Sequence, residues 1–141
     1  IGDGPLKNAL TAQAAQLQVE SRIKFLGSRR DIPELLSQLD IFVLCSTDEG
    51  MPISLLEAMA AGLPVVATKV GGIREIVVEN ETGLLIPPQN PGALADAMFK
   101  ILTDAPLARS MSKEAVRVVA ERFSIKKMAE GYTSLYENLL Q

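Results

Sequence analysis

Three short apolar runs, separated by polar loops and by turns that contain glycine or proline, mark the centre of the chain. They occupy residues 41–45, 65–67 and 84–86, and each has the length and composition of a buried strand. A fourth run, Ile23–Leu26, comes before them. Because helical apolar patterns fill the intervals, the sequence predicts an α/β fold with a doubly wound parallel sheet.

Apolar residues recur every three or four positions in the segments between and after these runs, as they do in amphipathic helices. We expect helices over residues 5–18, 32–38 and 55–61, a short one that ends at 77, and three more over 91–103, 106–121 and 125–140. The helix over 91–103 should bury Leu94, Ala97, Met98, Ile101 and Leu102. The last helix should bury a stripe made of Ile125, Met128, Ala129, Tyr132, Leu135, Tyr136 and Leu139.

Composition narrows the class of protein. With 141 residues, of which 48% are hydrophobic, the chain can form one domain with a real core. Its net charge of −3 argues against nonspecific nucleic-acid binding, and the lack of histidine beside a single cysteine argues against a zinc site. No apolar run reaches the roughly 20 residues that span a bilayer. We expect Cys45 to be a buried, inert thiol in a cytoplasmic protein.

The loop after the predicted strand 41–45 carries the residues that most clearly indicate a ligand-binding site. In a parallel sheet, ligands bind at the carboxyl ends of the strands, beside the first turn of the following helix. Glu49 lies in this loop, and Glu57 lies near the start of the helix. Ser54-Leu55-Leu56-Glu57 is also a capping-box pattern, in which Glu57 would bond back to the amide of Ser54. Taken alone, the pattern favours the cap over a ligand.

The segment Glu49-Gly50-Met51-Pro52, followed by Leu55-Leu56-Glu57-Ala58-Met59-Ala60, resembles the donor-site signature of the retaining glycosyltransferases with a GT-B fold, called group 1 or family 4. Further segments are similar to what that family carries in the same order: Gly2–Pro5, Phe25–Gly27, Gly62–Thr68 and Gly71–Val77. The resemblance covers nearly the whole chain. It implies a Rossmann-like domain that binds a nucleotide sugar.

The resemblance assigns the sugar end of the site to the loop. Glu49 would accept hydrogen bonds from hydroxyl groups of the transferred sugar, and it is the candidate catalytic residue. Gly50, Met51 and Pro52 would pass close under the sugar, where the lack of a side chain at Gly50 permits the approach.

The nucleotide end is assigned to the helix and to an earlier segment. By the resemblance, Glu57 would hold the ribose hydroxyls, and the free amides of Leu55 and Leu56 would receive a phosphate. The linked motifs favour this role for Glu57 over the cap. Arg29 and Arg30 occupy the segment where the family contacts the base, although a solvated basic pair explains them equally well.

The family comparison also implies that residues 1–141 are part of a larger enzyme. The acceptor-binding domain has no counterpart here, nor have the first strand, first helix and most of the second strand of the donor domain. The full enzyme would move a hexose from a nucleotide-diphosphate sugar to a glycan or lipid, with retention and without a metal or other cofactor. It would lie in the cytoplasm or at the inner face of the membrane, and the isolated chain should be inactive. Two alternatives stay open, a nucleotide-sugar epimerase of the same fold and a noncatalytic nucleotide-sugar-binding module.

An N-terminally incomplete sheet should have an exposed edge. In the strand order of this fold, residues 23–26, 41–45, 65–67 and 84–86 correspond to the third to sixth strands. Without the first two, the strand at 41–45 has a free edge that must be covered. We favour a strand from a second copy, which would make a dimer, or the missing segment itself. Pairing of 41–45 with 23–26 is the less favoured alternative.

Overall fold

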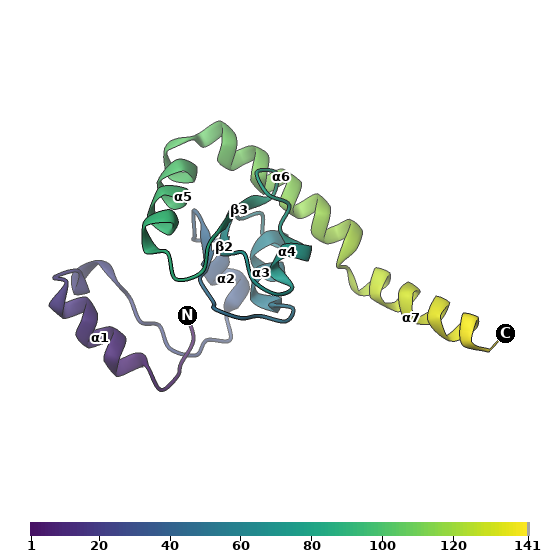
Figure 1. Ribbon diagram of the computed structural model, residues 1–141, viewed down its shortest axis with the longest axis horizontal. Helices are drawn as coiled ribbons and strands as arrows, with labels where there is room; N and C mark the ends of the chain where they lie inside the picture. Colours follow the sequence, from purple (N-terminus) through teal and green to yellow (C-terminus); the bar gives the residue numbers. More distant parts are fainter. Residues whose placement is uncertain (141) are drawn as a thin grey trace. The chain divides into compact units, whose positions relative to one another are not determined.

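The computed structural model describes residues 1–140, and the chain divides into two compact units at Leu35. Each unit is described by itself. The first contains helix α1, Lys7–Gln16, and a single 3₁₀ turn, η1, Glu20–Arg22 (Figure 1). The short helix α2, Ile32–Leu36, spans the boundary.

The predicted strand at 23–26 is wrong. Residues Ile23–Leu26 belong to no strand, because a strand needs a neighbour to complete its backbone hydrogen bonds and none of residues 1–140 forms a ladder with them. The amide of Gly2 donates to the carbonyl of Gly27, just after this segment. Within α1, only Ala14 is buried, so the expected helix forms without a covered apolar stripe.

The second unit holds a parallel sheet of three strands in the order β1-β2-β3. These are Phe42–Leu44, Val65–Thr68 and Gly83–Ile86, so all three central apolar runs are confirmed as strands. The central strand β2 is buried along its whole length. Leu44 pairs with Ala67, and Thr68 pairs with Ile86, so the carboxyl ends of the strands lie at one edge.

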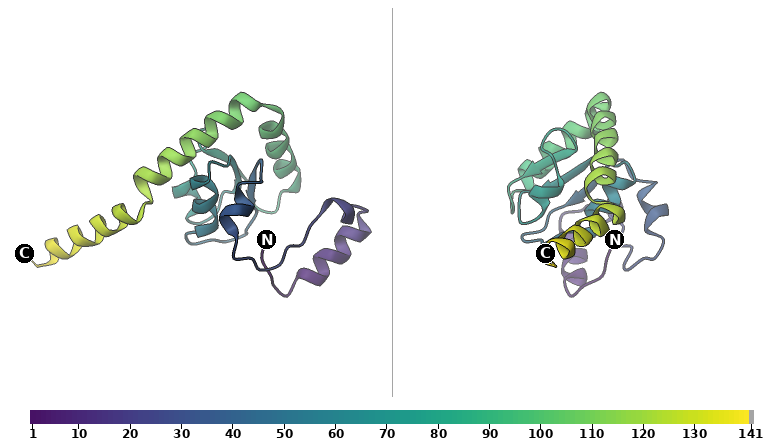
Figure 2. Two further views of the ribbon diagram at one scale, coloured as in Figure 1. Left: turned by 180° about the vertical axis from the view of Figure 1, so that it is seen from behind. Right: turned by 90° about the vertical axis from the view of Figure 1, so that its right-hand side faces the viewer.

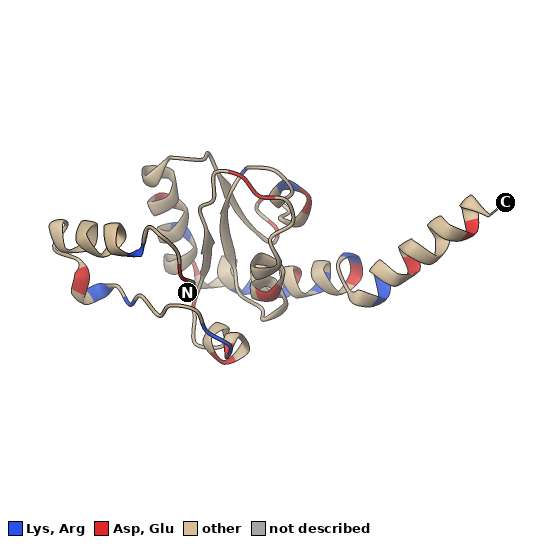
Figure 3. Cartoon of the chain, turned by 90° about the horizontal axis from the view of Figure 1, so that it is seen from below, with Lys and Arg blue, Asp and Glu red and all other residues tan. Residues whose placement is uncertain are grey.

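Five helices complete this unit: α3 at Ile53–Ala60, α4 at Ile73–Ile76, α5 at Pro91–Thr103, α6 at Ala105–Arg122 and α7 at Ile125–Leu139. Helix α5 lies on one side of the sheet, and α3 and α4 lie on the other (Figures 1 and 3). On the α5 side, Val66, Leu84 and Ile86 pack against Ala97, Ile101 and Met111. On the α3 side, Leu55, Ala58 and Met59 are fully buried. Helices therefore cover both faces, which confirms the predicted α/β class.

Several predicted burials are wrong. The whole stripe of α7 is exposed, from Ile125 at 81% to Leu139 at 73%, because α7 runs away from α6 and none of the other described residues covers it (Figure 2). Leu102, at the end of the α5 stripe, is 55% exposed, whereas Ala97 and Ile101 are buried as expected. Cys45 is exposed, because it follows the last residue of β1 and already belongs to the loop.

The outer edge of β1 has no ladder partner within residues 1–140. Its residues pair with β2 alone, in the register Phe42–Val65 to Leu44–Ala67. The less favoured alternative, in which residues 23–26 join this edge, is therefore not formed. A dimer or a preceding strand at the edge stays a prediction.

Candidate functional site

The loop between β1 and α3 is held by a chain of hydrogen bonds at the carboxyl edge of the sheet. The Ser46 hydroxyl donates to Oε1 of Glu49 at 2.8 Å. The carbonyl of Ser46 in turn accepts a hydrogen bond of 2.6 Å from Oγ1 of Thr68, the last residue of β2. Sequence reasoning singled out Glu49 but missed Ser46 and Thr68, because 22 residues separate them and only the parallel pairing brings them together.

The glycine pair Gly71-Gly72 packs directly under this loop. The amide of Gly72 donates to the carbonyl of Glu49 at 3.1 Å. A Cβ atom on Gly71 would lie 1.9 Å from that carbonyl oxygen, and one on Gly72 would lie 1.8 Å from the carbonyl oxygen of Gly50. Both distances are far inside van der Waals contact, so only glycine lets the two backbones approach this closely. The backbone of the glycine pair therefore holds the loop that carries Glu49 in place.

Helix α3 begins two residues earlier than predicted, which changes its free amides. Pro52 is the N-cap, in an extended conformation, and its carbonyl accepts the amides of both Leu55 and Leu56. The expectation that these two amides are free is therefore wrong. The amides of Ile53 and Ser54 come before the first helical hydrogen bond and have no acceptor among residues 1–140. They are the donors that the start of α3 presents.

Glu57 lies one turn into α3, with its side chain exposed. The capping box is not formed, because Pro52 rather than Ser54 occupies the N-cap position and makes no side-chain cap. The carboxylate of Glu57 has no hydrogen bond or ion pair with residues 1–140. This carboxylate is therefore free to accept hydrogen bonds from a ligand. Of the predicted loop residues, Gly50 and Met51 are exposed, whereas Pro52 is buried.

Arg29 and Arg30 lie in the first unit, and the two behave differently. Arg29 forms a bidentate salt bridge with Asp31, in which Nε donates to Oδ1 at 2.8 Å and a terminal nitrogen donates to Oδ2 at 2.5 Å. This contact lowers the pKa of the Asp31 carboxyl and raises the pKa of the Arg29 guanidinium. Both arginines are exposed, but the guanidinium of Arg29 is already occupied, whereas that of Arg30 has no hydrogen bond or ion pair with residues 1–140.

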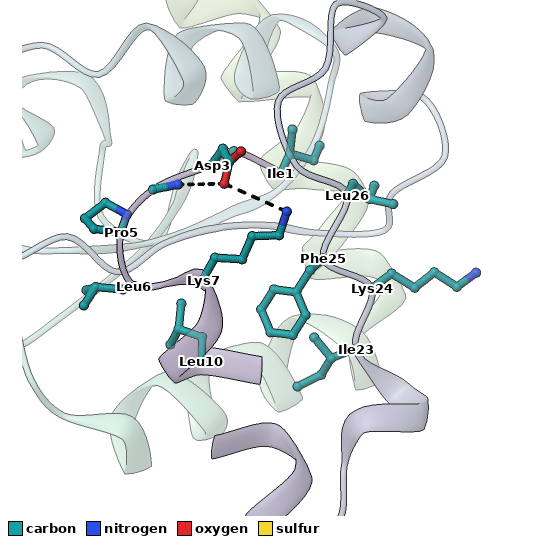
Figure 4. A pocket seen from close by; sticks show the side chains of 12 residues that line it. Ile1, Asp3, Pro5, Leu6, Lys7, Leu10, Ile23, Lys24, Phe25 and Leu26 are labelled. Carbon is teal, nitrogen blue, oxygen red and sulfur yellow. Dashed lines mark hydrogen bonds and ion pairs between the residues drawn. The ribbon is translucent and has the colours of Figure 1, made fainter. Parts of the chain in front are cut away.

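The first unit also contains an open hollow of about 580 Å³ that sequence reasoning did not find. Leu10 from α1 and Ile23 and Phe25 from the extended segment form apolar walls. Lys7 and Asp3 also line the hollow, with Nζ and Oδ1 3.9 Å apart (Figure 4). The two-residue spacing of Ile23 and Phe25, which places both on one side of an extended chain, was the available signal.

Charge and hydropathy add three observations. Acidic and basic residues are interspersed along α6 and α7 (Figure 3). Within the described residues there is no group of three or more histidine, cysteine, aspartate or glutamate side chains with the spacing of a metal site. None of the helices formed by residues 1–140 has both the length and the apolar character needed to cross a bilayer.

Comparison with known proteins gives consistent matches. The sequence family described as "Glycosyl transferases group 1" matches residues 1–118. N-acetyl-alpha-D-glucosaminyl L-malate synthase from Bacillus anthracis is 35% identical over 141 residues, which are 100% of this chain and 37% of that protein. This chain therefore spans little more than a third of the length of that relative.

Two solved structures resemble the fold closely. Sucrose-phosphate synthase from Thermosynechococcus elongatus matches with a TM-score of 0.89 and 31% identity, over 99% of this chain and 37% of its own. HepE from Anabaena, solved in complex with UDP-glucose, matches with a TM-score of 0.87 and 31% identity, over 94% of this chain and 39% of its own. Together with the family match over residues 1–118, these likenesses show that the chain belongs to the group 1 glycosyltransferases.

Proposed function

We propose that this chain is the donor-binding part of a retaining glycosyltransferase that uses a nucleoside-diphosphate sugar. The observation that carries the proposal is the arrangement at the carboxyl edge of the sheet. A fixed carboxylate at Glu49, two free amides at Ile53 and Ser54, and a second free carboxylate at Glu57 follow one another along a single loop and helix.

This order of groups fits the order of groups in a nucleotide sugar. Carboxylates accept strong hydrogen bonds from hydroxyl groups, so Glu49 would bind the sugar and Glu57 the ribose. The amides of Ile53 and Ser54, at the positive end of the helix dipole, would bind a phosphate of the leaving diphosphate. Such a site would accelerate transfer by stabilising the negative charge that develops on the leaving diphosphate. The likeness to HepE, solved with UDP-glucose, supports the donor class.

The remaining features of the reaction follow from the family resemblance and are part of the proposal. Transfer retains the anomeric configuration and needs no metal. A further domain binds the acceptor, a glycan or lipid, and cations outside residues 1–141 balance the rest of the diphosphate charge. Arg30 is the better of the two candidate base contacts, because Arg29 is paired with Asp31. We place the enzyme in the cytoplasm or at the inner face of the membrane. No observation favours the epimerase or the noncatalytic module.

The test is donor binding and product analysis with the full-length protein. Calorimetric titration with UDP-glucose, GDP-mannose and ADP-glucose should find one donor that binds, and NMR of the product should show the anomeric configuration of that donor. Glu57→Gln should weaken binding by about 1.5–3 kcal/mol, the worth of a hydrogen bond to a charged group. Its thermal stability should not change, since the side chain is exposed and caps nothing.

Glu137→Gln on α7 is the matched control, because it removes an exposed acid of the same type away from the loop. Its donor affinity should equal that of the wild type. Full donor affinity in Glu57→Gln would remove Glu57 from the site. An inverted product would remove the retaining mechanism, and failure of every donor to bind would contradict the proposed function.

A further inference from the structure

The carboxylate of Glu49 is held on one side only. Its Oε1 atom accepts the 2.8 Å hydrogen bond from Ser46, and Oε2 has no partner among residues 1–140. The residue is half-buried, and because none of the unpaired side-chain oxygens among residues 1–140 is buried, Oε2 remains accessible. A glutamate has three side-chain torsions, and a hydrogen bond to one oxygen limits where the other can lie.

The hydrogen bond to Ser46 is itself anchored in the core. Thr68, which donates to the Ser46 carbonyl at 2.6 Å, is only 1% exposed and ends the fully buried strand β2. Ser46 is therefore bonded through both its carbonyl and its hydroxyl, the first to the rigid sheet and the second to Glu49. The result is a continuous path from the central strand to the carboxylate.

We propose that Ser46 and Thr68 are positioning residues, which fix Oε1 of Glu49 so that Oε2 is presented to a hydroxyl group of the donor's sugar. The inference rests on the proposed function for the identity of the ligand, and on the two hydrogen bonds for the geometry. A preorganised acceptor binds its partner more tightly, because the side chain loses less freedom on binding. The support acts on the sugar end alone, since Glu57 and the amides of α3 lie outside it.

Because the support acts only at the sugar end of the site, a positioning role can be distinguished from a general effect on folding. A residue that merely stabilises the loop would change the affinity for nucleotide and nucleotide sugar alike. A residue that positions Glu49 changes only the affinity for the sugar-bearing form. The quantity to measure is the ratio of the dissociation constant of UDP to that of UDP-glucose, and likewise for GDP with GDP-mannose and ADP with ADP-glucose.

Calorimetric titration of the full-length protein and its Ser46→Ala variant gives this ratio. We expect Ser46→Ala to lower it about three- to tenfold, the worth of one hydrogen bond, with the dissociation constant of the nucleotide unchanged. Ser46→Thr keeps the hydroxyl and should restore the ratio. In a Glu49→Ala background, Ser46→Ala should have no further effect, because the group it positions is gone.

Three further variants test the anchoring hydrogen bond of Thr68 and provide a control. Thr68→Val removes the buried hydroxyl with little change of shape and should lower the ratio in the same direction, whereas Thr68→Ser should not. Ser112→Ala is the matched control, since Ser112 is also half-buried and its hydroxyl donates one hydrogen bond of 2.9 Å, to the Ala108 carbonyl on α6. It should leave the ratio at the wild-type value.

The outcomes separate this inference from the function on which it rests. An unchanged ratio in Ser46→Ala, or an equal loss of affinity for both ligand forms, would overturn the positioning role. If no nucleotide sugar binds the wild type, the proposed function fails. In that case, the side-chain scalar couplings of Glu49, measured by NMR without ligand, still test whether Ser46 fixes the carboxylate. We expect couplings of a single rotamer in the wild type and rotamer-averaged couplings in Ser46→Ala. Equal couplings in the two proteins would overturn the positioning role.

Discussion

Gly72 offers the sharpest test of how the loop is supported. Its backbone has φ −69°, which any residue adopts, so replacement by alanine introduces no backbone strain. The new Cβ atom would nevertheless lie 1.8 Å from the carbonyl oxygen of Gly50. Gly71, by contrast, has φ 42°, and there an alanine would add backbone strain to the clash. Gly72→Ala therefore tests the close contact without adding backbone strain.

The expected loss combines two contributions. The Cβ atom must move more than 1 Å away from Gly50, which separates the loop from α4 and costs about 1–3 kcal/mol, as overpacking does in cores. The same movement breaks the 3.1 Å hydrogen bond from the Gly72 amide to the Glu49 carbonyl, worth about 1 kcal/mol. The sum, about 2–4 kcal/mol, corresponds to a fall in Tm of roughly 6–20 °C for a chain of this size.

Thermal unfolding followed by circular dichroism measures this loss. Gly92→Ala is the control, because Gly92 lies in the first turn of α5 and its Cβ would meet only Asn90, at an ordinary 3.6 Å. Its Tm should be equal or slightly higher, since alanine favours a helix. A Gly72→Ala variant with the Tm of the wild type would refute the close backbone contact between the glycine pair and the loop.

Three further predictions follow from the same structure. Gly50→Ala should keep its Tm, because no atom lies within 4 Å of the new Cβ, but in the full-length protein it should weaken donor binding about tenfold if the sugar approaches the backbone here. The hydrogen bond from Arg117 lowers the pKa of Glu114 below its ordinary value of 4.5. The stabilisation of the folded state by this pair is therefore present above pH 4.5 and is lost as the pH falls through the lowered pKa. The Tm of the wild type should therefore fall more from pH 5 to pH 3 than that of Arg117→Gln, and equal slopes would contradict this. Residues 1–141 alone should transfer no sugar and bind a donor with about 4 kcal/mol or less, and turnover by this chain would contradict the proposal that a further domain binds the acceptor.

The elements that local chemistry determines could be predicted from the sequence. The bounds of α5 agree with the prediction, because Asn90 accepts the amide of Ala93 and Pro91 follows it, which is a clear helix start. The start of α3 was missed because Ser54 has the better capping side chain, whereas the chain turns at Pro52, which caps with its backbone alone. The free amides were assigned two residues too late for the same reason.

Features that depend on distant segments could not be predicted. The bond from Thr68 to Ser46 requires the register of β1 on β2, and the close approach of Gly72 to Gly50 requires the position of α4. The exposure of Cys45 depends on where β1 ends, at Leu44 rather than one residue later. A sequence pattern states which side chains are apolar, but burial needs a second surface, and none of residues 1–140 covers the stripe of α7.

The exposed helix α7 has a calorimetric consequence. Its apolar side chains are in water when the chain is folded and remain in water when it unfolds, so they add little to the heat capacity change of unfolding. That change is normally about 12–15 cal/mol/K per residue, so the 15 residues of α7 should leave it roughly 0.2 kcal/mol/K below the value expected from chain length. A chain that ends at Ser124 should show nearly the same heat capacity change, and nearly the same dependence on urea, as residues 1–141.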